Sequence, residues 1–84
     1  MVYLVFYTHR HGHNHYLFTN VADAYKCAEK IAEVNLKKFT TEEYTPSVAL
    51  ENWAEITQGD ENIEINSFEV YKSYEVYEKL WMVV

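Results

Sequence analysis

The amino-acid sequence predicts a small α+β fold: an N-terminal β-hairpin, two helices on one face, and C-terminal strand structure that completes an antiparallel or mixed sheet. Three observations predict this class. The chain begins with strand-like residues, continues with two stretches of helical spacing, and returns to β-branched and aromatic residues in its last quarter. With 84 residues, 49% of them hydrophobic, we expect a single domain, residues 1–84, around one core.

Residues 2–19 are expected to form the hairpin. The run from Val2 to Thr8 is short, almost entirely apolar and rich in Val, Tyr and Phe, which favours a strand buried on both faces. A second apolar run covers residues 16–18. Gly12 lies between the two runs and adopts positive φ without steric cost, so the tip of the hairpin is predicted near this glycine.

The first helix is predicted to begin after Asn20 or Thr19, either of which can cap it, and Asp23 adds negative charge to its first turn. Lys37 and Lys38 suit the negative end of the helix dipole in its last turn. The residues expected to face the sheet recur at helical spacing: Val21, Ala24, Tyr25, Ala28, Ile31, Ala32 and Asn35.

A second helix is predicted within residues 41–58, with two ways to begin. Either Thr40 caps a first turn and Pro46 kinks the helix, or Thr45 is the cap and Pro46 the first helical residue; we favour the second. Gly59 occupies the position where a glycine commonly ends a helix. The side chains expected to be buried are Val48 or Ala49, Leu50, Trp53 and Ile56.

The last quarter of the chain is expected to begin with a strand over residues 62–72. Its apolar residues change parity between Ile65 and Phe68, which suggests a bulge near Asn66 and Ser67. Residues 73–84 fit a strand or a helix equally well.

The acidic residues are concentrated in the second half of the chain. Residues 1–40 hold five basic and three acidic residues, a net charge of +2, whereas residues 41–84 hold two basic and ten acidic residues, a net charge of −8. Such a balance disfavours direct nucleic-acid binding and favours a partner protein with a basic surface.

Cysteine content and hydropathy indicate a cytoplasmic protein. The single cysteine, Cys27, excludes an intramolecular disulfide, and its place within the first predicted helix suits a small buried side chain. No stretch is apolar enough to span a membrane, and no basic residue precedes the first apolar run as in a signal peptide.

No sequence motif for catalysis is present. The chain lacks the GxSxG, Walker and GxGxxG patterns and contains only two glycines, so we expect a protein that is not an enzyme and needs no cofactor.

All four histidines occur at alternate positions: His9, His11, His13 and His15. Alternate residues share one face of a strand, and the hairpin turn would bring the second pair across, so zinc, nickel or copper binding is an alternative function. The hairpin offers no carboxylate as a further ligand, which favours a solvated tip or a partner contact instead.

The expected partner-binding surface combines the acidic residues with surplus tyrosines. Eight tyrosines are too many for so small a core to bury with their hydroxyls satisfied, and tyrosine is favoured at interfaces. The candidate residues are Glu42, Glu43, Glu51, Glu55, Asp60, Glu61, Glu64, Glu69, Tyr71, Tyr74 and Tyr77. The uncharged end, residues 80–84, is a further contact through which two copies would form a homodimer.

In size, acidity, aromatic content and order of elements, the chain resembles the small accessory proteins of bacteriophages, among them the anti-CRISPR class. This resemblance covers the layout and no motif, so no functional residue is carried over. It implies a stoichiometric inhibitor that occludes a nucleic-acid-binding defence complex in the host cytoplasm, where an acidic surface would occupy a cationic groove.

Overall fold

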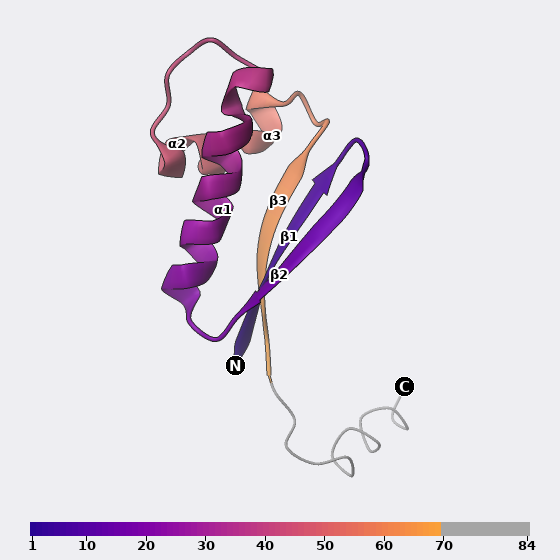
Figure 1. Ribbon diagram of the computed structural model, residues 1–84, viewed down its shortest axis with the longest axis vertical. Helices are drawn as coiled ribbons and strands as arrows, with labels where there is room; N and C mark the ends of the chain where they lie inside the picture. Colours follow the sequence, from indigo (N-terminus) through magenta and orange to yellow (C-terminus); the bar gives the residue numbers. More distant parts are fainter. Residues whose placement is uncertain (70–84) are drawn as a thin grey trace.

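The computed structural model describes residues 1–69, which form a three-stranded antiparallel sheet with helices on one face (Figure 1). The elements are β1 (Val2–His9), β2 (Gly12–Phe18), α1 (Val21–Asn35), the 3₁₀-helix η1 (Leu36–Lys38), α2 (Pro46–Glu51), α3 (Trp53–Ile56) and β3 (Asn62–Phe68). This arrangement confirms the predicted α+β class. None of the helices in residues 1–69 is long and apolar enough to cross a membrane.

The strands lie in the order β2-β1-β3, and β1 is antiparallel to both neighbours. The β1–β2 ladder ends with His9 opposite Gly12, so residues 10–11 make the turn. Gly12 has φ of +130°, a conformation that L side chains rarely adopt. The hairpin and its tip are therefore found where the sequence predicts them.

The two faces of the sheet differ in what covers them. Val5 is fully buried and packs with Ala24 and Ala28 of α1. The alternate residues of β1, among them Leu4 and Phe6, point to the opposite side, which we call the open face because no other element of residues 1–69 covers it (Figure 1). Within residues 1–69 the buried residues of β1, Val5 and Tyr7, both lie on the helix face, so the predicted burial on both faces is found there on one face only.

Strand β3 pairs with β1 without interruption, from Val2 opposite Phe68 to Thr8 opposite Asn62. The predicted bulge near residues 66–67 is absent. The alternation of faces continues to the end of the strand. Phe68 lies opposite Val2 on the open face, and the Phe68 side chain is 49% exposed. Residues 70–84, which include the end of the predicted strand and the segment 73–84, lie outside the described residues.

Helix α1 is capped by Asn20, whose side-chain oxygen accepts a 2.7 Å hydrogen bond from the Ala22 N–H. Its buried residues are all alanines, Ala24, Ala28 and Ala32, so the helix backbone can approach the sheet closely. Val21 and Tyr25 are 43% and 50% exposed, so the predicted apolar stripe is wrong at these two positions. The helix ends at Asn35, and the two predicted C-terminal lysines belong to η1.

Helix α2 begins as the favoured alternative predicts, with Thr45 as the cap and Pro46 as the first helical residue. The Thr45 hydroxyl accepts a hydrogen bond from the Val48 N–H at 3.4 Å. Where one helix was expected, Asn52 interrupts it. This residue has φ −106° and ψ 17°, and its side-chain amide donates to the Val48 carbonyl at 3.0 Å, so the chain continues as α3. Ala49 is buried while Val48 is 41% exposed, which decides between the two expected core positions.

The end of α3 is closed one residue earlier than predicted. Gln58 occupies the left-handed position with φ of 54°, and its N–H bonds the Glu55 carbonyl at 3.2 Å. Gly59 follows with φ of 83° and bonds the Ala54 carbonyl at 2.9 Å. These two bonds make a Schellman motif. Gly59 therefore takes part in ending the helix, but as the second residue after the cap residue Thr57 and not as the first.

Candidate functional site

A cleft of about 540 Å³ with an excess of acidic residues lies beside the loop between η1 and α2. It is lined by Glu33, Leu36, Lys37, Thr40, Thr41, Glu42, Glu43 and Tyr44. We call it the acidic cleft because it has three carboxylates and a single lysine. Two of these carboxylates, Glu42 and Glu43, were predicted as partner-binding residues.

Hydrogen bonds within the loop shape the acidic cleft. The Thr40 hydroxyl accepts from the Glu42 N–H at 3.1 Å, and the Tyr44 hydroxyl donates to the Glu42 carboxylate at 2.8 Å. This bond to Glu42 raises the pKa of Tyr44, with smaller contributions from desolvation and from the charges of Glu42 and Glu55. The influence of Glu55 on Tyr44 indicates that α3 adds negative potential to the cleft.

The carboxylates around the acidic cleft are largely free of cationic partners. In the described part of the chain the only ion pair is Lys30 with Glu33, at 3.6 Å. None of the exposed predicted residues Glu42, Glu43, Glu51 and Glu55 is in an ion pair there. Their negative charge therefore remains available to an approaching basic group.

The other predicted acidic residues lie elsewhere. Asp60 and Glu61 line a different cleft, Glu64 is on the open face and accepts from the Asn62 side chain at 2.8 Å, and Glu69 follows the end of β3. Together with Glu42 and Glu43 at the acidic cleft, these residues occupy four separate places and do not form one surface within residues 1–69. Three predicted residues, Tyr71, Tyr74 and Tyr77, lie outside the described residues.

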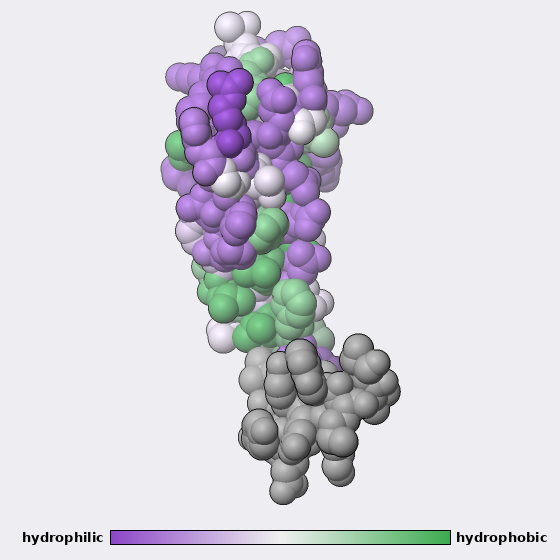
Figure 2. All heavy atoms as spheres, turned by 90° about the vertical axis from the view of Figure 1, so that its right-hand side faces the viewer, coloured by the Kyte–Doolittle hydropathy of each residue, from purple (hydrophilic) through white to green (hydrophobic). Residues whose placement is uncertain are grey.

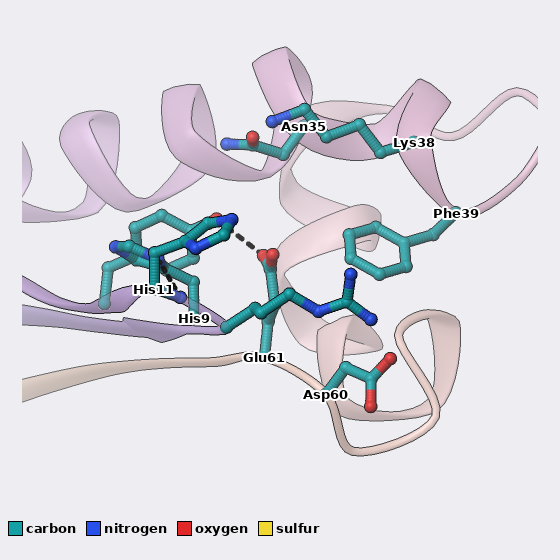
Figure 3. Close-up of a pocket in the computed structure, with 9 residues that line it drawn as sticks. His9, His11, Asn35, Lys38, Phe39, Asp60 and Glu61 are labelled. Carbon is teal, nitrogen blue, oxygen red and sulfur yellow. Dashed lines mark hydrogen bonds between the residues drawn. The ribbon is translucent and has the colours of Figure 1, made fainter.

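A second cleft, of about 520 Å³, lies under the hairpin tip (Figure 3). It is lined by Tyr7, His9, Arg10, His11, Asn35, Lys38, Phe39, Asp60 and Glu61. We call it the tip cleft. It combines basic and acidic side chains, and the sequence alone did not indicate that the hairpin and the residues before β3 meet here.

The tip cleft is held by a hydrogen bond in which the Tyr7 hydroxyl donates to the Glu61 carboxylate at 2.6 Å. Tyr7 is only 9% exposed, and burial, followed by this bond and the Glu61 charge, raises its pKa strongly. Glu61 is positioned in turn by buried Thr57, whose hydroxyl accepts from the Glu61 N–H at 3.3 Å. In this arrangement Glu61 serves the fold and is less available to a partner than its charge suggested.

The four histidines are divided between the two faces of the hairpin. His9 and His11 line the tip cleft, whereas His13 and His15 lie on the open face beside Phe6, with ring centroids 5.1 and 4.7 Å from it. The register explains the division. Each β1–β2 pair joins an even-numbered residue to an odd-numbered one, so His13 and His15 lie on the same face as the even-numbered residues of β1 and on the opposite face from His9. The prediction that alternate histidines of one strand share a face is confirmed. The prediction that the turn brings the second pair of histidines to the first pair is wrong.

The surroundings of the histidines bear on metal binding. His9 Nδ1 accepts from the His11 N–H at 3.3 Å and its Nε2 lies 2.6 Å from Asn14 Oδ1, so both ring nitrogens of His9 are engaged. His13 and His15 have ring centroids 4.7 Å apart. Within residues 1–69, no three His, Cys, Asp or Glu side chains are grouped so that they could hold a metal ion.

Cys27 is half-buried against the cluster that contains Val5, as a structural role requires. Burial raises the pKa of its thiol, which disfavours the reactive thiolate.

The open face carries the largest exposed apolar side chains of the sheet. Leu17 is 68% and Phe68 49% exposed, while Val2, Leu4 and Phe6 between them are half-buried. Figure 2, which looks at this side of the molecule, shows the hydrophobic residues gathered in its lower part and hydrophilic residues above them. This patch was not predicted from the sequence, because Val2, Leu4 and Phe6 were expected to be buried within a strand covered on both faces.

Residues 1–69 form a small α+β fold in which helices cover one face of an antiparallel sheet, and the acidic cleft and the tip cleft lie on its surface. The chain matches no protein-family model, no curated protein and no solved structure.

Proposed function

We propose that this protein is a non-enzymatic binding module that takes a basic partner protein at the acidic cleft. The observation that supports this function is the lining of the cleft, which holds Glu33, Glu42 and Glu43 and a single lysine, Lys37; among the described residues only Glu33 has an ion-pair partner, Lys30. An excess of carboxylates around a concave site attracts an arginine or lysine side chain and repels phosphate backbones.

An arginine of the partner fits the cleft better than a lysine does. The guanidinium group presents five N–H donors in a planar fork and can bond a carboxylate with two of them. Tyr44 adds an aromatic ring beside Glu42, and arginine stacks on such rings. Leu36 supplies apolar surface for the methylene groups of the same side chain.

Exposed ion pairs are weak individually, about 0–1 kcal/mol each. The acidic cleft is therefore proposed to steer and orient the partner, with Glu51 and Glu55 extending the negative potential along α2 and α3. Binding of this kind weakens as salt concentration rises, because exposed charges are screened.

The form of this function that the layout favours is a phage-type inhibitor. Its basic target would be the nucleic-acid groove of a host defence complex in the cytoplasm, and the net charge of −8 over residues 41–84 would compete with nucleic acid there.

The test compares two double variants with the same change in net charge. Glu42→Lys with Glu43→Lys alters the acidic cleft, while Glu64→Lys with Glu69→Lys alters β3 and the residue that follows it. With a fluorescein-labelled oligoarginine peptide as probe, measured by anisotropy at low salt, the cleft variant should bind at least about tenfold more weakly than wild type, or about 1.4 kcal/mol. The control should lose much less.

Equal losses in the two variants would mean that net charge alone attracts the probe, and the acidic cleft would be rejected as the site. The same pair then serves to identify the target: a protein captured from a bacterial lysate by wild type and by the control, but not by the cleft variant, is a partner of this site. Displacement of nucleic acid from that partner tests the inhibitor form.

Metal binding by the histidines is the second candidate function. It is supported by the adjacent rings of His13 and His15, to which a bound partner or substrate could add further ligands.

A further inference from the structure

The open face has one continuous apolar patch, formed by Val2, Leu4, Phe6, Leu17 and Phe68. The cross-strand pairs explain its continuity, because Leu4 lies opposite Leu17 and Val2 lies opposite Phe68. We call these five residues the apolar patch. Leu17 and Phe68 are its most exposed members, at 68% and 49%.

The described chain ends at this patch. Phe68 is the last residue of β3 and belongs to the apolar patch, and Glu69 is the last residue described. The following segment, residues 70–84, is therefore attached within one residue of exposed apolar surface. Figure 1 shows the end of β3 at the lower end of the sheet, and Figure 2 shows the hydrophobic residues gathered in the lower part of this side of the molecule.

The composition of residues 70–84 complements the apolar patch. Ten of the fifteen residues are aliphatic or aromatic: Val70, Tyr71, Tyr74, Val76, Tyr77, Leu80, Trp81, Met82, Val83 and Val84. Left in water, such a segment and the patch would each expose large side chains, and both costs fall when the two meet.

The length of the segment also matches the face. An eight-residue strand such as β1 extends about 26 Å at about 3.3 Å per residue. Fifteen residues would extend about 22 Å as a helix. Val70, Tyr74, Tyr77 and Trp81 recur at the spacing of one helical face, so the sequence provides an apolar stripe of this length.

We propose that residues 70–84 dock on the open face and cover the apolar patch, which gives the sheet a covering layer on its second side. A second copy of the chain would offer similar apolar surface, but a tethered segment competes at an effective concentration of the order of millimolar. The chain's own segment therefore fills the patch first. This inference is independent of the acidic cleft.

Tryptophan fluorescence of the full-length chain tests the docking. Trp53 is 2% exposed in the core, so the difference between the spectra of wild type and Trp81→Phe isolates the emission of Trp81 without disturbing that core. If residues 70–84 dock, the Trp81 emission is shifted to shorter wavelength, and acrylamide quenches it several-fold less than free tryptophan.

Two further variants locate the docking site, each made with and without Trp81→Phe. Leu17→Lys places a charge in the apolar patch, while Val34→Lys changes a residue of equal character on α1, where it is 63% exposed. Leu17→Lys should restore quenching of Trp81 towards that of free tryptophan, and Val34→Lys should leave it at the wild-type level. Circular dichroism verifies that each variant is folded.

Free quenching of Trp81 in wild type overturns the proposal, and this measurement decides even if Leu17→Lys does not fold. Protection that survives in a folded Leu17→Lys variant overturns it as well, because the segment would then be docked elsewhere. Protection that disappears on dilution, together with a mass of two chains at high concentration, would show that a second copy covers the patch and not the attached segment.

Discussion

The hydroxyl of Tyr7 donates a 2.6 Å hydrogen bond to the carboxylate of Glu61, a residue 54 positions later in the chain. This bond joins β1 to the segment that leads into β3, at the floor of the tip cleft. It links two segments far apart in the sequence through a charged acceptor in a partly buried place, where hydrogen bonds are stronger than in water.

Removing the Tyr7 hydroxyl should therefore destabilise the protein. For Tyr7→Phe we expect the free energy of unfolding to fall by about 1–2 kcal/mol, the lower range for a hydrogen bond to a charged group. Urea denaturation of Tyr7→Phe, Glu61→Ala and the double variant measures the coupling between the two residues. Tyr25→Phe is the matched control, because Tyr25 is 50% exposed and its loss should change stability little. A coupling near zero would contradict the role assigned to the bond.

The same bond predicts how stability depends on alkaline pH. Burial and Glu61 raise the pKa of Tyr7 in the folded state above its usual value near 10. The unfolded chain therefore releases this proton first, so the stabilisation is complete below about pH 10 and is lost as the pH rises towards the folded-state pKa. Stability measured by urea denaturation should decline from about pH 10 upwards, and less steeply in Tyr7→Phe. An identical decline in both proteins would contradict the assignment.

Local sequence signals predicted most of the fold because they act between neighbouring residues. Asn20, Thr45 with Pro46, and Gly12 were all identified from capping and turn preferences and have these roles in the structure. The break at Asn52 was missed because its cause, a side chain that bonds the helix's own backbone, is neutral in the hydrophobic pattern.

Long-range register limited what could be predicted about the candidate sites. The faces of His9 and His13 depend on which residues of β1 and β2 pair, and one residue of slip would place both histidines on the same face. Glu61 was counted with the exposed acidic residues because its partner, Tyr7, lies at the other end of the chain. Residues 42–43 depend less on long-range register, because residues 40–44 of their own loop make up most of the lining of the acidic cleft.

Two positions with positive φ should respond in opposite ways to substitution. Gly12→Ala forces a side chain into φ of +130°, and we expect a loss of about 1–3 kcal/mol in unfolding free energy from backbone strain alone, since no atom lies within 4 Å of the added Cβ. Gln58→Gly relieves a left-handed residue with φ of 54° and should raise stability by up to about 1 kcal/mol. Thermal or urea unfolding of both variants provides the comparison. A stabilised Gly12→Ala variant would contradict the turn geometry.

Zinc titration should separate the two histidine pairs. His9 has both ring nitrogens engaged, by Asn14 and by the His11 N–H, whereas His13 and His15 stand side by side on the open face. We therefore expect any zinc binding to be abolished by His13→Ala with His15→Ala and retained by His9→Ala with His11→Ala.

Two imidazoles leave half of a tetrahedral zinc shell to solvent, so calorimetry should give a dissociation constant weaker than about 1 μM. Affinity should also fall as the pH is lowered, since protons compete with the metal for imidazole nitrogen. Binding tighter than micromolar that is lost in both double variants would mean that the four histidines act together. That result would require a hairpin register other than His9 opposite Gly12 and would favour metal binding as the function.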